Sequence, residues 1–219
     1  MRIFAISDTY NDKIIIQKLK KFIDKNNNNF DYIVHCGDIG GKDKNARNLI
    51  EFGEYQKTHL DHLLDNYKKL LFILGNDDWF ESESVYHLPY CYWKPENFIP
   101  FELVHITPFN TNREANENKI WYELNKLNIN SESIVVAHDP PYNCLDMTSR
   151  GVKVGSKSVR DYIEGKQLKL WLCGHIHESF GVKSIGNTGV FNCACSPERH
   201  LLRGWVIDTD TLYYEKVII

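Results

Sequence analysis

Five short apolar runs in this chain each end directly before a polar side chain of a kind that binds metal ions. The runs are Ile3–Ile6, Tyr32–His35, Leu70–Leu74, Ile134–Ala137 and Leu168–Cys173. Short runs that do not alternate between apolar and polar residues are typical of strands buried on both faces, as in a parallel sheet. Because the carboxyl ends of parallel strands lie at one edge of a sheet, the side chains that follow these runs are expected to meet.

The residues that follow the runs are of three ligand types: aspartate, asparagine and histidine. They are Asp8, Asp38, Asn76, His138, His175 and His177. Carboxylate, amide and imidazole groups together form an oxygen and nitrogen donor set that suits divalent cations. A single histidine near a strand end is often a hydrogen-bonded core residue. Six residues of ligand type in this order, three of them histidines, instead indicate metal ligands. We therefore predict a site for two cations and a metal-dependent hydrolase.

The order of these segments resembles that of the calcineurin-like metallophosphoesterase superfamily. The matching pieces are Asp8, Gly37-Asp38, Gly75-Asn76, His138 and Gly174-His175-Ile176-His177. The stretches Thr107–Thr111 and His138–Tyr142 are similar to those of small prokaryotic-type members. The resemblance implies an α/β fold of four layers, in which two packed mixed β-sheets are flanked by helices. The length of 219 residues fits a single domain over 1–219 and could bury about 70% of the unfolded surface.

The resemblance also implies a role for each predicted ligand. Asp38 matches the carboxylate that bridges two metal ions. Asn76, His138 and His175 match the ligands of the second metal, and Asp8 and His177 match ligands of the first. Two divalent or trivalent ions, such as manganese, iron or zinc, would then activate a shared water as a metal-bound hydroxide for in-line attack on a phosphoester.

Two positions depart from the family pattern. The opening Asp-x-His motif is Asp8-Thr9-Tyr10 here, so a histidine ligand of the first metal is missing. Tyr10 could replace it as a phenolate, could contact substrate or another ligand, or could be a tyrosine at the rim without a role in metal binding. Alternatively, Asn11 or Asp12 could supply the missing ligand, or the first site could be weak. The second departure is Asp77, which stands where many members have a histidine that assists the leaving group. We predict that Tyr10, Asp77 and His175 act in the reaction.

An aspartate at position 77 changes the expected chemistry. A carboxylate beside two cations has a lowered pKa and is a poor general acid at neutral pH. A preference for substrates with good leaving groups follows. Asp78 is expected to orient the loop or a ligand through hydrogen bonds. Arg113, Arg150 and Lys153 could contact phosphate, although side chains of this kind are usually solvated.

Composition restricts the partners. The net charge is −3 and the pI is about 6.3, so no basic field attracts nucleic acid, and a small phosphorylated substrate is favoured. No apolar run approaches the roughly 20 residues of a membrane span. The six cysteines show no disulfide framework, which indicates buried thiols, a reducing compartment and a cytoplasmic location. The irregular, aromatic segment Trp79–Pro100 could cover a sheet edge or form a homodimer contact.

Other elements are expected from local patterns. A helix should begin at Asp12, a second near Arg113–Leu127, and a charged helical region should span Lys44–Lys69, with His59 and His62 on its surface. Gly186–Gly189 reads as a hairpin turn, followed by strands near Leu202–Asp208 and Leu212–Ile218.

The sequence thus favours hydrolysis of a small phosphodiester, or of a phosphomonoester. The alternatives are a phosphomonoesterase that acts on a nucleotide or a phosphoprotein, and a non-catalytic scaffold of the same fold with an impaired first metal site.

Overall fold

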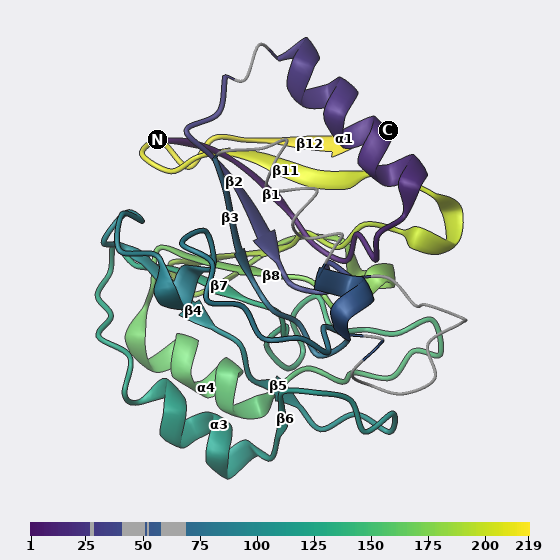
Figure 1. The fold of residues 1–219 in the computed structure, drawn as a ribbon. Coiled ribbons are helices and arrows are strands. Elements are labelled where there is room, and N and C mark those ends of the chain that lie inside the picture. Colours follow the sequence, from purple (N-terminus) through teal and green to yellow (C-terminus); the bar gives the residue numbers. More distant parts are fainter. Residues whose placement is uncertain (27–28, 41–50, 52, 58–68) are drawn as a thin grey trace.

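Two five-stranded sheets form the centre of the structure (Figure 1). The computed structural model describes residues 1–26, 29–40, 51, 53–57 and 69–219. The first sheet has the order β12-β11-β1-β2-β3, with bounds Tyr214–Ile218, Arg203–Asp208, Arg2–Ile6, Tyr32–Cys36 and Leu70–Ile73. The second sheet has the order β4-β7-β8-β10-β9, with bounds Phe98–Phe101, Ile134–Ala137, Leu170–Cys173, Thr188–Asn192 and Gly181–Ile185.

Both sheets are mixed. Strands β1, β2 and β3 are parallel to each other, and β11 and β12 extend that sheet in antiparallel pairing. In the second sheet β4, β7, β8 and β10 are parallel, and only β9 pairs antiparallel. The five predicted strands are therefore present, but they are divided between two sheets, three in the first and two in the second.

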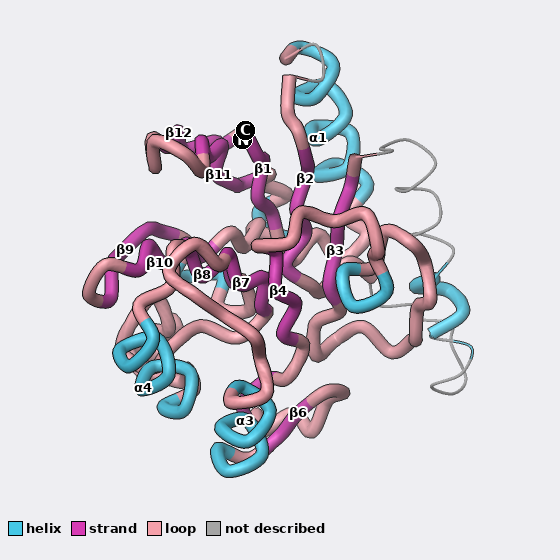
Figure 2. The backbone as a smooth tube through the Cα atoms, turned by 90° about the vertical axis from the view of Figure 1, so that its left-hand side faces the viewer, coloured by secondary structure: helices cyan, strands magenta, loops and turns pink. Residues whose placement is uncertain are grey.

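Apolar side chains of the two sheets face each other and form the central core, which includes Ile3, Val34, Val136 and Leu172. Helix α1 (Lys13–Lys25) covers the outer face of the first sheet, and α3 (Glu117–Leu124) and α4 (Lys157–Lys166) cover the outer face of the second. Figure 2 shows α1 at one side of the strands and α3 and α4 at the opposite side. The expected four-layer α/β arrangement is confirmed.

The helices begin where side chains satisfy their free main-chain amides. The carboxylate of Asp12 accepts from the amides of Ile14 and Ile15, as expected for the start of α1. Helix α3 is shorter than the predicted Arg113–Leu127, because Glu114–Ala115 forms strand β6 against β5 (Val104–His105) before Asn116 caps the helix. Short 3-10 turns lie at Leu88–Tyr90, His177–Ser179 and Pro197–Arg199.

Several further predictions are confirmed and one lies largely outside the described residues. Strands β9 and β10 form the predicted hairpin around Gly186. Segment Trp79–Pro100 is irregular as far as residue 97 apart from the short 3-10 turn, but its last three residues belong to strand β4, which the sequence did not predict. Within the predicted helical region 44–69, residues 53–57 are helical, whereas His59 and His62 are outside the described part of the chain. Among the described residues, no helix is both long and apolar enough to cross a bilayer.

The two sheets are joined at the end where the predicted ligands lie. Ser7, just after β1, forms a parallel bridge with Ala194, just after β10. The amide of Asp8 donates to the carbonyl of Gly37, and the amide of Gly174 donates to the carbonyl of His138. The loops that follow β1, β2, β7 and β8 are thus held together by main-chain hydrogen bonds.

Candidate metal centre

The loops at this end turn sharply so that their side chains point back over the strand ends. Asp8, Asp38 and His175 have φ angles of 58°, 55° and 66°, in the left-handed region. Strain of this kind is found mainly at functional sites. Two motif glycines allow the loops to approach: a Cβ on Gly75 would overlap Oδ1 of Asp38, and a Cβ on Gly174 would overlap Oδ2 of Asp8.

Asp38, His138 and His175 form a compact group of ligand atoms. One donor atom from each lies within 4.8 Å of the others. Nε2 of His138 is 3.3 Å from Oδ2 of Asp38, and both side chains are buried. Nδ1 of His138 is bonded to the carbonyl of Cys36 at 2.7 Å, which fixes the ring and aims Nε2 at the group.

The electrostatics of this group favour positive charge. Burial opposes protonation of His138, but the Asp38 carboxylate beside it raises the pKa of that histidine to about 10. Burial and the charge of His138 lower the pKa of His175 to about 4, which leaves its imidazole neutral. Despite burial, the histidine and Tyr10 keep the pKa of Asp38 well below its usual value. The Asp38 carboxylate thus favours positive charge at the neighbouring His138.

Asn76 lies next to Asp77, whose amide donates to Asp38. Oδ1 of Asn76 is buried and has no hydrogen-bond partner, and by hydrogen-bond geometry the same is true of Nε2 of His138. Buried polar atoms are almost always paired, so two unpaired atoms beside a carboxylate call for an explanation. A cation would satisfy both, and the donor set fits one.

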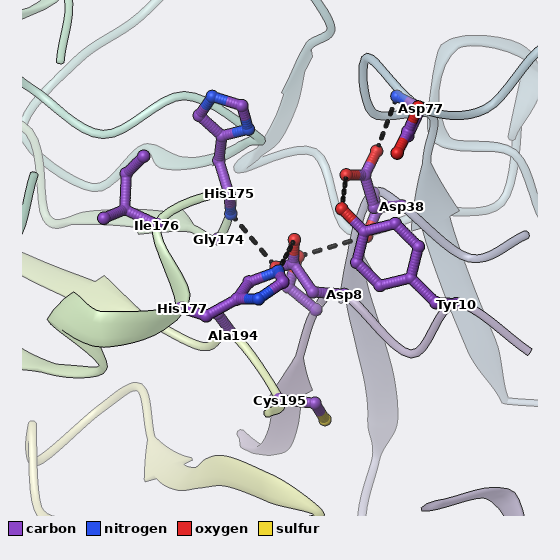
Figure 3. A network of polar contacts seen from close by, with 12 residues as sticks. Asp8, Tyr10, Asp38, Asp77, Gly174, His175, Ile176, His177, Ala194 and Cys195 are labelled. Atoms are coloured by element: carbon purple, nitrogen blue, oxygen red, sulfur yellow. Dashed lines mark hydrogen bonds and ion pairs between the residues drawn. The ribbon is translucent and has the colours of Figure 1, made fainter. Parts of the chain in front are cut away.

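Asp8 and His177 form a second pair next to the first group (Figure 3). Nε2 of His177 is 3.3 Å from Oδ1 of Asp8, and the amide of His175 donates to Oδ2 of Asp8 at 3.0 Å. Nδ1 of His177 contacts a carboxylate oxygen of Glu198 at 2.9 Å. Burial opposes protonation, but Asp8 and Glu198 raise the pKa of His177 to about 9.

Tyr10 and Asp77 both contact Asp38. The Tyr10 hydroxyl donates to Oδ2 of Asp38 at 2.6 Å, and the amide of Asp77 donates to Oδ1 at 2.9 Å. Figure 3 shows Asp77 above the Asp38 carboxylate and Tyr10 below it, each at a different carboxylate oxygen. Burial and the surrounding carboxylates raise the pKa of Tyr10 well above its ordinary value, so the phenol is protonated and acts as a donor.

Asp78 holds the loops that carry Asp38 and Asn76. Its buried carboxylate accepts from four main-chain amides, those of Asp38, Ile39, Gly40 and Gly75, at 2.8–3.0 Å. The loop-orienting role predicted for Asp78 is therefore present in the structure. No other side chain connects the two loops by as many hydrogen bonds among the described residues.

Arg113 does not have the phosphate-binding role considered for it. Its guanidinium is largely buried and donates to the main-chain carbonyls of Gly75, Asp78 and Phe80. It also pairs with the Glu81 carboxylate. Arg113 thus fixes the loop after β3. Lys153 donates to Asn143, and Arg150 is exposed.

Two neighbours of the site were not singled out in the sequence: Thr111, which bonds to Asn76, and Glu198, which contacts His177. Thr111 lies within a segment noted only for its resemblance to small members. Glu198 lies in a 3-10 turn after the last ligand, and no sequence period marks it.

The buried group of aspartate and histidine side chains at the joined ends of two packed mixed sheets could hold a metal ion, as a metal-dependent phosphoesterase requires. The family model for calcineurin-like phosphoesterases matches residues 1–179. This chain belongs to the calcineurin-like phosphoesterase family and is a metallophosphoesterase.

One protein of known sequence and two solved structures are similar to this chain. The uncharacterized protein MJ1162 of Methanocaldococcus jannaschii is 33% identical over 175 residues, which cover 74% of this chain and 76% of that protein. One crystal structure superposes with a TM-score of 0.70 at 17% identity, over 99% of this chain and 98% of the other. TT1561 of Thermus thermophilus superposes with a TM-score of 0.62 at 14% identity, over 99% and 97% of the two chains. These two structures share the fold.

Proposed function

We propose that this metallophosphoesterase hydrolyses a small phosphodiester at a centre of two metal ions. The observation that carries the proposal is the buried group of Asp38, His138 and His175, with unpaired atoms on Asn76 and His138 that a cation would satisfy. Asp38, Asn76, His138 and His175 would hold one ion, and Asp8 and His177 would hold the other, with Asp38 shared. Two ions such as manganese, iron or zinc would supply charge neutralisation at the phosphoryl group and lower the pKa of a water.

The residues of the chain prepare this site in distinct ways. Tyr10 and the amide of Asp77 each hold one oxygen of Asp38, so that the shared carboxylate has a fixed orientation. Glu198 holds His177 toward Asp8, and the Cys36 carbonyl holds His138 toward Asp38. The cost of ordering these groups is met during folding, which leaves a preorganised site.

A diester is favoured over a monoester because the nearby arginines already donate their hydrogen bonds to the protein main chain. Arg113 and Arg203 reach the loops that carry the site, but they donate to main-chain carbonyls and stabilise those loops. A monoester carries more negative charge than a diester and needs more positive groups around it. The acidic pI favours small substrates over long nucleic acids.

Asp77 supports a preference for good leaving groups. Its main chain is bonded to Asp38, which places its carboxylate near the shared ligand, where cations would keep it ionised. An ionised carboxylate does not donate a proton to a departing alkoxide. Aryl esters should therefore react much faster than alkyl esters.

Hydrolysis of bis(p-nitrophenyl) phosphate by metal-stripped protein tests this proposal. We expect turnover to appear on titration with Mn²⁺ and to be abolished by Asp38→Asn, while the exposed control Asp161→Asn keeps it. p-Nitrophenyl phosphate should react more slowly than the diester. If manganese, zinc and iron all fail to give turnover with either substrate, the enzymatic proposal is wrong and a scaffold role replaces it.

A further inference from the structure

The side-chain amide of Asn76 has two ends of nearly the same shape and opposite chemistry. Its Nδ2 donates to Oγ1 of Thr111 at 2.7 Å, and its Oδ1 is buried without a hydrogen-bond partner. Only the oxygen end can bind a cation, because the NH₂ end has no lone pair to offer. A metal site that uses this amide therefore needs something to keep Nδ2 away from the ion.

The hydroxyl of Thr111 can play only one part in its contact with Asn76. Oγ1 of Thr111 is 2.5 Å from Oε1 of Glu114, and an ionised carboxylate accepts hydrogen bonds but cannot donate them. A hydroxyl has a single proton, so Thr111 donates it to Glu114. Its oxygen must then accept from Asn76, which requires Nδ2 at that position and leaves Oδ1 facing the opposite way.

Glu114 is held as an ionised acceptor. The hydroxyls of Thr107 and Thr111 donate to Oε1, and the amides of the same two residues donate to the carboxylate at 3.1 and 2.9 Å. Partial burial acts to raise the pKa of Glu114, but these hydrogen bonds outweigh it and lower the pKa below the usual value.

Further hydrogen bonds connect the segment around Thr111 to the loop that carries Asn76. The amide of Asn112 donates to the carbonyl of Asn76 at 3.0 Å, and Arg113 donates to the carbonyl of Phe80 at 2.8 Å. Both the side chain and the main chain of Asn76 are therefore bonded to residues 111–112. The direction of the amide is set by a rigid connection.

We propose that Thr111 and Glu114 are positioning residues that orient the Asn76 amide so that its oxygen faces the cation. This inference rests on the proposed metal centre and adds to it two residues that do not touch the metal. Partners of this kind typically change metal affinity by about 10–100-fold when they are removed.

The chain offers a matched control. Thr107 is also half-buried, its hydroxyl also donates to Oε1 of Glu114 at 2.6 Å, and it accepts from the main-chain amide of Phe109. The two threonines thus differ in the group that donates to their hydroxyl oxygen: the Phe109 amide for Thr107, and Nδ2 of Asn76 for Thr111. Thr107→Val and Thr111→Val remove the same group from the same carboxylate, but only the second removes the acceptor for Asn76.

Glu114→Met tests the donor and acceptor logic directly. The substitution removes the carboxylate that accepts the Thr111 proton, which frees that proton to point at Asn76. The amide can then turn and present Nδ2 to the cation site. We expect this variant to lose metal affinity although it keeps the approximate size of the side chain.

The experiment is calorimetric titration of the metal-stripped proteins with Mn²⁺, with thermal unfolding in the presence of a chelator as a check of folding. Thr111→Val and Glu114→Met should bind about 10–100-fold more weakly than the wild type, and Thr107→Val should bind within about threefold of it. Thr111→Ser, which restores the hydroxyl, should recover most of the affinity. If Thr111→Val binds Mn²⁺ as tightly as Thr107→Val does, this inference is wrong, whereas the proposed metal centre is unaffected.

The failure of the proposed function would look different. In that case the wild-type protein itself would bind no Mn²⁺, and the whole series would show no heat of binding. If Thr111→Val does not fold, Glu114→Met still decides the question, because it leaves Thr111 in place. A Glu114→Met protein that folds and binds Mn²⁺ as tightly as the wild type would show that amide orientation does not depend on Glu114.

Discussion

The hydroxyl of Tyr10 donates a 2.6 Å hydrogen bond to Oδ2 of Asp38, the same oxygen that lies 3.3 Å from Nε2 of His138. The tyrosine stands where the family has the histidine of its Asp-x-His motif. Its phenol reaches the carboxylate that would be shared between two ions, and its ring lies edge-on to His177 at 5.6 Å between centroids. Tyr10 therefore contacts residues of both predicted metal sites.

Tyr10→Phe should separate the ligand role from the positioning role. Because the phenol is a protonated donor to Asp38, we expect the number of bound metal equivalents to stay the same. Turnover of the aryl diester should fall by about tenfold, as for other residues that orient a ligand. Elemental analysis and kinetics on Tyr10→Phe, with the exposed Tyr213→Phe as control, measure the two effects. Loss of one metal equivalent would instead identify Tyr10 as a ligand.

Gly75→Ala should damage the site, because the added Cβ would overlap Oδ1 of Asp38. Overpacking of this kind costs about 1–3 kcal/mol, and the displaced carboxylate should remove most metal-dependent turnover. Gly165→Ala is the matched control, since nothing lies within 4 Å of its added Cβ and it is in helix α4. That variant should gain up to about 1 kcal/mol in the free energy of unfolding. Chemical denaturation and kinetics on both proteins decide between these effects.

Glu117→Gln should destabilise the fold at neutral pH. The Glu117 carboxylate accepts from the amides of Lys157 and Ser158 and from the Ser156 hydroxyl, at the start of α4. Burial opposes the effect, but these bonds lower the pKa of Glu117. We expect a loss of roughly 1–2 kcal/mol, because hydrogen bonds to charged groups are strong and this one is partly exposed.

The pH dependence of this effect has a definite sign. A carboxylate with a folded-state pKa below its unfolded value of 4.5 stabilises the fold above that value. Its contribution is lost as the pH falls through the lower, folded-state pKa. The difference between wild type and Glu117→Gln should therefore be full at pH 7 and shrink in the acid range below about pH 4.5. A difference that stays constant across this range would contradict the prediction. The exposed Glu83→Gln serves as control.

The sequence predicted the parts of this structure that follow a local rule. The five apolar runs became strands within two residues of their expected ends, because strands buried on both faces carry no polar alternation. Asp12 and Gly186 marked a helix start and a hairpin turn by their own backbone preferences. The length of helix α3 was overestimated, because no local pattern shows that Glu114–Ala115 pairs with another strand.

The contacts that orient the ligands were beyond sequence reasoning. Thr111 bonds to Asn76 across 35 residues, and Glu198 contacts His177 across 21. Both lie in irregular segments whose paths depend on tertiary packing, so no period or motif marks them. Tyr10 was recognised as unusual, but no local pattern indicated that its hydroxyl would donate to Asp38.

The rate at which the six cysteines are labelled should report how often the buried strands become accessible to solvent. All six are buried free thiols, and burial raises the pKa of Cys173 well above its usual value and that of Cys195 to about 12. The thiolate is the nucleophile that attacks a disulfide reagent, so the native protein should show no rapid labelling, and all six thiols should react in concentrated guanidinium.

Metal binding should extend this protection. The carbonyl of Cys36 is bonded to His138, so opening of the strand that carries this thiol disturbs the proposed ligands. A ligand that binds only the closed state lowers the open population by the factor 1 + [L]/Kd, so Mn²⁺ at 100 times its Kd should slow labelling by about 100-fold. Asp38→Asn should remove this effect of Mn²⁺. Labelling at the same rate with and without Mn²⁺ in the wild type would show that these thiols become accessible without opening of the metal centre.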